Sequence, residues 1–179
     1  IRGLHFQSPP FEQGKFVQVL SGNVLDVIVK KSKSDLNNSS TIATGSLRRK
    51  AQWLAKYPNH TIVPLRGNIQ TRLKKLQEGA WEGAVFAEAA LDRLKVNEDN
   101  VEVLDWMLPA PAQGALMIVC KSNDLELFNV LQELNVEEAA LCTKIERDFL
   151  RTLEGGCTAP IGAIATIEKD RVHFRGGVF

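Results

Sequence analysis

Two groups of residues in this sequence have side chains that could do chemistry. The first is a set of basic residues between Leu36 and Gln77, a stretch that contains no Asp or Glu and carries a charge of +8, whereas the whole chain carries +1. The second is a thiol, Cys157, which follows two glycines. A concentrated basic patch usually faces an anionic partner, and an accessible thiol can act as a nucleophile. The basic residues of the first group are Arg48, Arg49, Lys50, Lys56, Arg66, Arg72, Lys74 and Lys75.

Four arginines occupy positions that helices disfavour. Arg48 and Arg49 fall in the first turn of one predicted helix, and Arg66 and Arg72 flank the start of a second, which Asn68 can cap. A helix N-terminus carries partial positive charge and free N–H groups, so each cation there costs a few tenths to about 1 kcal/mol. These positions predict an anionic ligand that arginine can bind bidentately. The alternative is a solvated basic face.

The lysines of the same stretch have a simpler interpretation. Lys56, Lys74 and Lys75 come late in their predicted helices, where cations suit the helix dipole, and we expect them to be surface charges. Trp53 and Tyr57 beside a basic patch make nucleic acid a rival ligand. However, the sequence has no helix-turn-helix, zinc-finger or RNP pattern, and its pI is only 7.9. We therefore expect no nucleic-acid partner.

The cysteines show neither a metal-binding nor a disulfide pattern. There are three, with no Cys-x-x-Cys spacing, which favours a reducing cytoplasm and predicts no metal. Cys120 and Cys142 lie within a predicted strand and a predicted helix, and we expect both to be small buried apolar residues. Cys157 lies in a predicted accessible loop, although from its position alone an inert thiol is the better interpretation because no His or Lys is evident to activate it.

The elements that would position these residues alternate between strand and helix patterns. Predicted strands at 41–43, 61–63 and 83–87 are each followed by a predicted helix, at 46–57, 68–79 and 88–94. This order is typical of a parallel α/β sheet, in which both arginine-bearing helix starts lie at the C-terminal edge, where such sheets bind ligands. Further strands are predicted at 16–20, 24–29, 101–104 and 115–120.

The pattern changes after Ser122. Helices are predicted at 125–134 and 137–153, followed by antiparallel strands at 161–167 and 172–174 around a turn at Lys169-Asp170. We predict an α/β domain with connecting strands over residues 16–121, a smaller, partial α+β domain over 122–179, and a remnant of an N-terminal domain or a linker over 1–15. No apolar run approaches the roughly 20 residues of a membrane helix, so no membrane partner is expected.

Four motifs, in this order and spacing, resemble the hydroxymethylbilane synthase (porphobilinogen deaminase) family. They are Thr44-Gly45-Ser46-Leu47-Arg48-Arg49, Leu65-Arg66-Gly67-Asn68-Ile69-Gln70-Thr71-Arg72-Leu73, Pro109-Ala110-Pro111-Ala112-Gln113-Gly114-Ala115, and Glu146-Arg147-Asp148-Phe149-Leu150 leading into Gly155-Gly156-Cys157.

The resemblance implies a cytoplasmic, monomeric transferase that joins four porphobilinogen molecules into linear hydroxymethylbilane, with loss of ammonia at each step. It implies that Cys157 holds a dipyrromethane cofactor through a thioether. The arginines would bind the carboxylates of cofactor and growing chain, with neighbouring polar contacts. Arg93 matches a further basic position, but it could equally pair with Asp92 on the surface. The implied binding residues are Arg48, Arg49, Arg66, Arg72, Arg93, Thr44, Ser46 and Gln113.

The resemblance also implies a fold and exposes departures from the family. The family has three domains, the first two like type 2 periplasmic binding proteins, and this chain is expected to hold the second domain and part of the third. The family's catalytic Asp, in a His-Ser-x-Lys-Asp motif, has no counterpart here, so we expect a fragment that does not turn over alone. Ala90 and Ala112 stand where Gly is usual. The alternative is a non-catalytic anion-binding module of periplasmic-binding-protein type.

Overall fold

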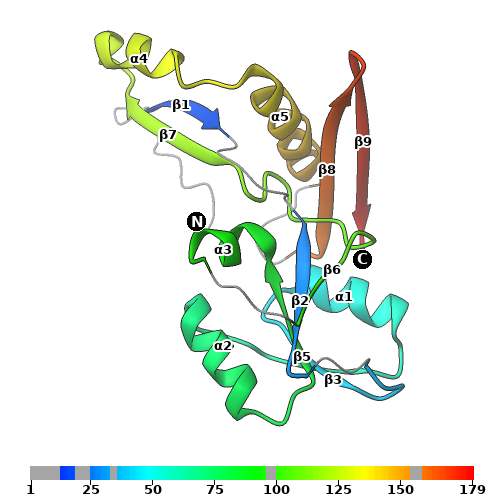
Figure 1. Ribbon diagram of the computed structural model, residues 1–179. Helices are drawn as coiled ribbons and strands as arrows, with labels where there is room; N and C mark the ends of the chain where they lie inside the picture. The colour runs from blue at the N-terminus through cyan, green and yellow to red at the C-terminus, as the bar shows by residue number, and fades with distance from the viewer. Residues whose placement is uncertain (1–12, 19–24, 33–35, 96–99, 154–158) are drawn as a thin grey trace.

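The computed structural model describes residues 13–18, 25–32, 36–95, 100–153 and 159–179, in two layered units (Figure 1). In chain order the elements are β1 (Gln13–Gln18), β2 (Asp26–Lys30), β3 (Thr41–Ala43), α1 (Leu47–Lys56), β4 (Thr61–Val63), α2 (Ile69–Glu78), β5 (Gly83–Ala87), α3 (Glu88–Arg93), β6 (Val101–Val103), β7 (Leu116–Lys121), α4 (Leu125–Gln132), α5 (Glu137–Thr152), β8 (Ile161–Glu168) and β9 (Arg171–Val178).

The first unit is a five-stranded sheet in the order β4-β3-β5-β2-β6. β3 pairs in parallel with β4 and with β5, as the strand–helix alternation predicted, which confirms the α/β class. β2 runs antiparallel to both β5 and β6, so the sheet is mixed and not purely parallel. The described residues between β2 and β3, 31–32 and 36–40, form no helix, and a return of the chain in the parallel direction needs such a crossover.

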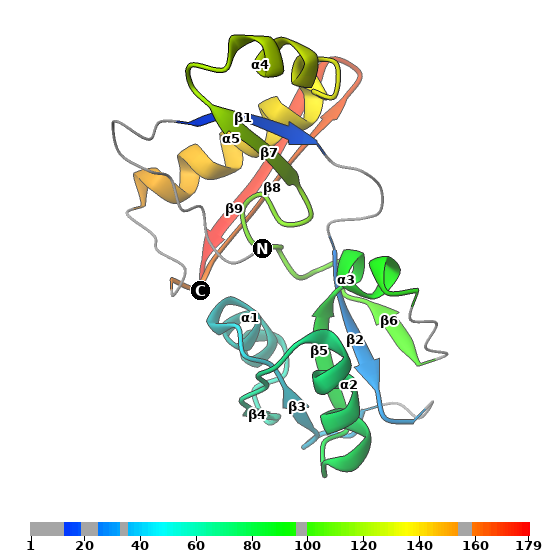
Figure 2. The ribbon, with the colours of Figure 1, turned by 90° about the vertical axis from the view of Figure 1, so that its left-hand side faces the viewer.

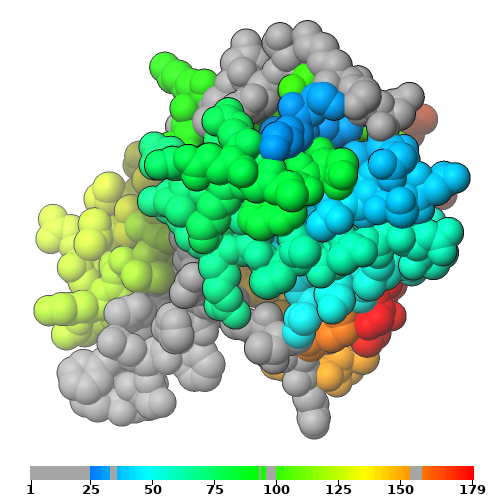
Figure 3. Space-filling view, turned by 90° about the horizontal axis from the view of Figure 1, so that it is seen from below, coloured from blue at the N-terminus to red at the C-terminus, as the bar shows by residue number. Residues whose placement is uncertain are grey.

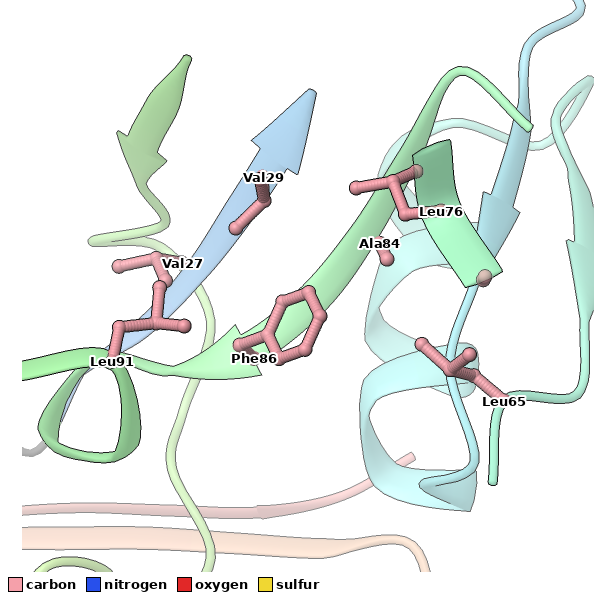
Figure 4. Close-up of a cluster of buried hydrophobic side chains, with 8 residues drawn as sticks. Val27, Val29, Leu65, Leu76, Ala84, Phe86 and Leu91 are labelled. Carbon is pink, nitrogen blue, oxygen red and sulfur yellow. The ribbon is translucent and has the colours of Figure 1, made fainter. Parts of the chain in front are cut away.

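Both faces of this sheet are buried, because alternate residues along β2 and β5 point to opposite sides. The face under α2 and α3 holds the side chains in Figure 4, namely Val27, Val29, Ala43, Leu65, Leu76, Ala84, Phe86 and Leu91. The face under α1 holds Ile28, Ile42, Trp53, Val85, Leu104 and Met107. The sheet is therefore the middle layer of three, with its helices fixed by apolar burial worth about 1.5–3 kcal/mol for each large side chain.

The helices begin where their cap residues predict. Ser46 caps α1 by accepting a hydrogen bond from the backbone N–H of Arg49 at 3.4 Å, and Asn68 caps α2 by accepting one from Thr71 at 2.8 Å. Gly79 follows the last residue of α2, as predicted. Neither helix has an acidic residue in its first turn, so the unpaired N–H groups at both starts remain electropositive.

The second unit contains α4, α5, the antiparallel pair β1–β7 and the hairpin β8–β9 (Figure 2). The hairpin turns at Lys169 and Asp170, as predicted, and both residues have positive φ, 49° and 62°. Seen from below, the α/β unit covers most of the molecular face, and the C-terminal hairpin shows only at its margin (Figure 3). None of the helices in the described part of the chain combines the length and hydropathy that a membrane-spanning helix requires.

Candidate anion-binding site

Two helix starts lie side by side at one edge of the sheet. β3 and β4 are parallel and in register, with Ala43 opposite Val63, so both end at the same edge. The backbone N–H of Thr44 donates to the carbonyl of Val63 at 3.0 Å, and a Cβ on Gly45 would lie only 2.5 Å from the carbonyl oxygen of Leu65. Glycine is therefore required at position 45 for the two connecting segments to approach. The predicted convergence of the two helix starts is confirmed.

The two hydroxyl groups at the start of α1 take part in its capping turn. Thr44 is buried, and its Oγ1 accepts from the backbone N–H of Ser46 at 3.3 Å. Ser46 Oγ in turn accepts from Arg49, as described above. Each hydroxyl keeps its own O–H as a donor. The polar contacts to a ligand that the motif implies for Thr44 and Ser46 stay predictions.

Arg48 and Arg49 bind a carboxylate of the protein itself. Arg49 Nη2 lies 2.7 Å from Asp26 Oδ1, and Arg48 Nη1 lies 2.8 Å from Asp26 Oδ2. All three residues are buried, with Asp26 at 0% exposure and the arginines at 5% and 9%. Arg49 also donates to the carbonyl of Val85 at 3.2 Å, and Arg48 donates to the carbonyl of Leu108. The two guanidiniums thus share one counterion inside the protein.

The direction of β2 brings Asp26 to this site. Asp26 is the first residue of β2 and lies opposite Ala87, the last residue of β5, so it sits at the C-terminal edge of the parallel strands. The sequence analysis did not predict that Asp26 is part of this site, because the local sequence does not determine in which direction β2 runs. A signal was present, since an Asp followed by Val-Ile-Val in a buried strand needs a charged partner.

The charges of this cluster support one another. Burial by itself would raise the pKa of Asp26, but the guanidiniums of Arg49 and Arg48 outweigh it and hold the pKa of this carboxyl below its usual value. Burial lowers the pKa of Arg48, Asp26 opposes that change, and the neighbouring Arg49 adds to it. Two arginines and one aspartate leave the cluster with a net charge of +1.

Gln113 joins this cluster, and the contact to a ligand that the family motif implies for it stays a prediction. Its Nε2 donates to Asp26 Oδ1 at 3.0 Å, and its Oε1 accepts from Arg48 Nη2 at 3.3 Å. Gln52, which the sequence reasoning did not single out, holds the same segment. Its Nε2 donates to the carbonyl of Leu108 at 3.0 Å and its Oε1 accepts from the N–H of Leu108 at 2.8 Å. The segment from 108 to 113 is therefore fixed against α1 by side chains.

The other side of this segment is fixed by Glu146 on α5. Its Oε2 accepts from the backbone N–H of Ala112 at 2.6 Å, and its Oε1 accepts from Ala165 on β8 at 2.8 Å. Burial raises the pKa of this carboxyl, although both N–H donors act in the opposite direction. Ala112 has a φ of 57°, which explains physically why the resembled family usually has Gly here. Glu146 thus links the site to the second unit.

The arginines of the second helix lie nearer to solvent. Arg66 is exposed, and its carbonyl accepts from Lys75 Nζ at 3.0 Å. Arg72 is partly buried, and its Nε donates to the carbonyl of Gly67 at 2.7 Å, where a φ of 126° requires glycine. Arg93 closes α3, but its side chain is outside the described part of the structure.

The structure describes two of the three cysteines. Cys120 is buried, as predicted, whereas Cys142 is only partly buried, because it lies near the exposed side of α5. Burial raises the pKa of the Cys142 thiol, and Glu146 and Glu138 raise it further, so this thiol is a poor nucleophile. Cys157 lies outside the described residues. Within the described ranges no cluster of His, Cys, Asp and Glu could hold a metal ion.

The fold and the site define an α/β protein that gathers arginines and helix N-termini at one sheet edge. The family model described as porphobilinogen deaminase, dipyromethane cofactor binding domain, matches residues 15–129, and the model of the porphobilinogen deaminase C-terminal domain matches residues 140–179. The chain belongs to the porphobilinogen deaminase family.

Similar proteins include porphobilinogen deaminases of bacteria and plants. That of Limosilactobacillus reuteri is 41% identical over 148 residues, covering 81% of this chain and 48% of the relative. The chloroplastic porphobilinogen deaminase of Pisum sativum is 47% identical over 149 residues, covering 81% of this chain and 40% of the relative. The chain thus spans about half the length of the curated relatives that it matches. Among solved structures, a substrate-binding domain of a putative amino acid ABC transporter from Streptococcus pneumoniae matches with a TM-score of 0.42 and 14% identity, covering 83% of this chain and 62% of that one.

The residues present fit a ligand rich in carboxylates, such as the dipyrromethane named in the family model. Arg66 is exposed just before the start of α2, and free backbone N–H groups are present at the starts of both α1 and α2. Arg49 Nε is buried and has no hydrogen-bond partner among the described residues, so it is a donor still to be satisfied. Cationic and neutral donors of this kind suit carboxylate oxygens.

Proposed function

We propose that this chain forms the oligopyrrole-binding part of a porphobilinogen deaminase. The observation that carries the proposal is the convergence of two arginine-bearing helix starts at one edge of the sheet. Each pyrrole unit of the proposed ligand carries two carboxylates, so a chain of such units is a dense polyanion that needs several cationic donors. Arg66 and Arg72 at α2, with the cluster at α1, would supply them.

Cys157 is proposed to anchor the dipyrromethane. Loss of ammonia from an aminomethylpyrrole leaves an electrophilic methylene carbon, and attack by the Cys157 sulfur with loss of its proton forms a thioether. When bound, the dipyrromethane would supply the pyrrole carbon to which the next unit is joined. Arg48, Arg49, Arg66, Arg72 and Arg93 would bind carboxylates of the cofactor and growing chain, with polar contacts from Thr44, Ser46 and Gln113.

The whole reaction is the stepwise condensation of four porphobilinogen molecules into hydroxymethylbilane, in the cytoplasm and by a monomer. The 179 residues contain no His-Ser-x-Lys-Asp motif to provide the acid that assists loss of the amine. We therefore expect this chain by itself to accept the cofactor without sustained turnover. Porphobilinogen supplied to the isolated chain should yield no continuing formation of linear tetrapyrrole, and sustained formation would refute this part of the proposal.

Intact-protein mass spectrometry tests the anchor. The chain is incubated with preformed hydroxymethylbilane, which joins a thiol with loss of water, and we expect a mass increase equal to one attached oligopyrrole. The Cys157→Ser variant should stay unmodified, whereas the matched control Cys142→Ser should be modified like the wild type. An unmodified wild type that still binds porphobilinogen would favour the alternative, a non-catalytic anion-binding module. Modification of Cys157→Ser would show that another residue is the anchor.

Arg66 offers the cleanest test of carboxylate binding, because its side chain is exposed and its loss leaves no buried charge unpaired. Replacing Arg66 by Leu should weaken porphobilinogen binding, measured by titration calorimetry, without lowering the unfolding midpoint. The Lys74→Leu variant is the control, because Lys74 is also basic but lies within α2, away from its start, in an exposed pair with Glu78 at 3.6 Å. Equal affinities of the two variants for porphobilinogen would contradict the proposed carboxylate-binding role of Arg66.

A further inference from the structure

One buried carboxylate at the site serves three side chains that the family motifs place near the ligand. Asp26 Oδ1 receives Arg49 Nη2 at 2.7 Å and Gln113 Nε2 at 3.0 Å, and Oδ2 lies 2.8 Å from Arg48 Nη1. Asp26 has no exposed surface. It therefore cannot serve as a surface charge, and its effect on a ligand passes through the three side chains that it contacts.

Two adjacent guanidiniums in a buried place are unfavourable without a counterion. Each loses hydration and repels the other, and both effects lower the pKa of Arg48. The Asp26 carboxylate cancels one of the two charges and contacts both groups at once. Two further contacts have fixed acceptors, with Arg49 Nη1 on the carbonyl of Val85 and Arg48 Nη1 on that of Leu108, whereas Arg49 Nε has no partner among the described residues. Both planar groups are thereby held in one orientation.

We infer that Asp26 is a positioning residue of the anion site, which keeps Arg48 and Arg49 oriented together at the ligand-facing edge without touching the ligand. The inference deepens the proposed function and rests on it. An alternative role for Asp26 predicts the opposite change in ligand affinity when this residue is replaced. If Asp26 merely occupied the arginines in place of a ligand carboxylate, its removal would free a positive charge and tighten binding.

The positioning can be measured in the wild-type chain by ¹⁵N NMR of the arginine side chains. A guanidinium held on both sides by fixed acceptors rotates slowly, so we expect separate Nη1 and Nη2 signals for Arg48 and Arg49. Arg66, which is exposed, provides the averaged signal for comparison within the same protein. Signals of Arg48 and Arg49 averaged like that of Arg66 would overturn the inference, and this measurement needs no variant to fold.

Porphobilinogen binding tests the consequence for the ligand. We expect Asp26→Asn to bind porphobilinogen about tenfold more weakly, a difference of about 1.4 kcal/mol, although it adds one positive charge. The control Asp105→Asn makes the same change of charge at an exposed position and should bind like the wild type. If Asp26→Asn does not fold, Asp26→Glu takes its place: it keeps the charge but shifts the carboxylate by one methylene, and it should also bind porphobilinogen more weakly than the wild type. Unchanged or tighter binding by the Asp26 variants would overturn the inference.

The two arms separate failure of the inference from failure of the proposed function. If the wild type itself does not bind porphobilinogen, the proposed function fails, and the NMR signals still decide whether Arg48 and Arg49 are held in one orientation. If the wild type binds and Asp26→Asn binds as well, the proposed function stands and the positioning role does not.

Discussion

Replacing Ala112 by Gly should stabilise the protein. Ala112 has a φ of 57°, in the left-handed region, where a Cβ costs roughly 1–2 kcal/mol. The new glycine would give the unfolded chain more freedom, which offsets roughly 0.5–1 kcal/mol of that gain. We therefore expect the free energy of unfolding to rise by about 1 kcal/mol. For a chain of this length, such a gain raises the unfolding midpoint by about 2–4 °C.

The native contacts of Ala112 should survive this change. Its backbone N–H donates to Glu146 Oε2 at 2.6 Å, and its carbonyl accepts from the N–H of Ala115 at 3.3 Å. Both bonds use main-chain atoms that glycine also has. The substitution therefore removes only the strained methyl group, and the gain in stability should come without loss of a contact.

Thermal and urea unfolding, followed by circular dichroism, provide the measurement. The matched control is Ala90→Gly, the other position where the resembled family usually has Gly. Ala90 lies inside α3 and is not among the described residues with positive φ, so glycine there should destabilise by about 1 kcal/mol. The two Ala-to-Gly changes should thus have opposite signs. Destabilisation by both variants would refute the argument from backbone strain at Ala112.

Three further predictions concern other contacts. Replacing Lys169 and Asp170 together by Asn-Gly should stabilise the hairpin, because both have positive φ, and urea unfolding should show a gain of about 1 kcal/mol. Replacing Gln52 by Ala should cost about 2 kcal/mol in the same assay, because it orphans the N–H of Leu108 in a partly buried place; an unchanged midpoint would contradict this. The pKa of Asp26 is lowered in the folded state, so its pairing stabilises the fold above about pH 4 and is lost as pH falls through the lower folded value. The difference in unfolding free energy between wild type and Asp26→Asn should therefore narrow below about pH 4, and a constant difference would argue against the pairing.

Local signals in the sequence predicted the elements of the site well. Ser46 and Asn68 are cap residues because their side chains can satisfy free N–H groups within a few residues, and that is a property of the chain alone. The turn at Lys169-Asp170 was likewise local. The helix starts converge because two short strands with crossover helices pair in parallel, and the alternation of strand and helix predicts this.

Local sequence signals could not predict which residues pair with Arg48 and Arg49. The absence of acidic residues from 36 to 77 suggested that the partner of Arg48 and Arg49 is a bound ligand. In the structure both arginines instead pair with Asp26, which lies outside that stretch. Likewise, Glu146 lies far from Ala112 in the sequence, and its carboxylate accepts a hydrogen bond from the backbone N–H of Ala112. Contacts between segments so distant in sequence depend on strand direction and register, which no local pattern encodes.

The sequence by itself determined the family, the class of fold, and the placing of arginines at two helix starts, because motifs, hydrophobic periodicity and caps are written in neighbouring residues. The tertiary structure alone decided that β2 runs antiparallel, that one buried aspartate is shared by two arginines, and that Ala112 is strained. The physical reason is that a buried charge takes its counterion from whichever segment packs beside it, and packing is settled only when the whole sheet has formed.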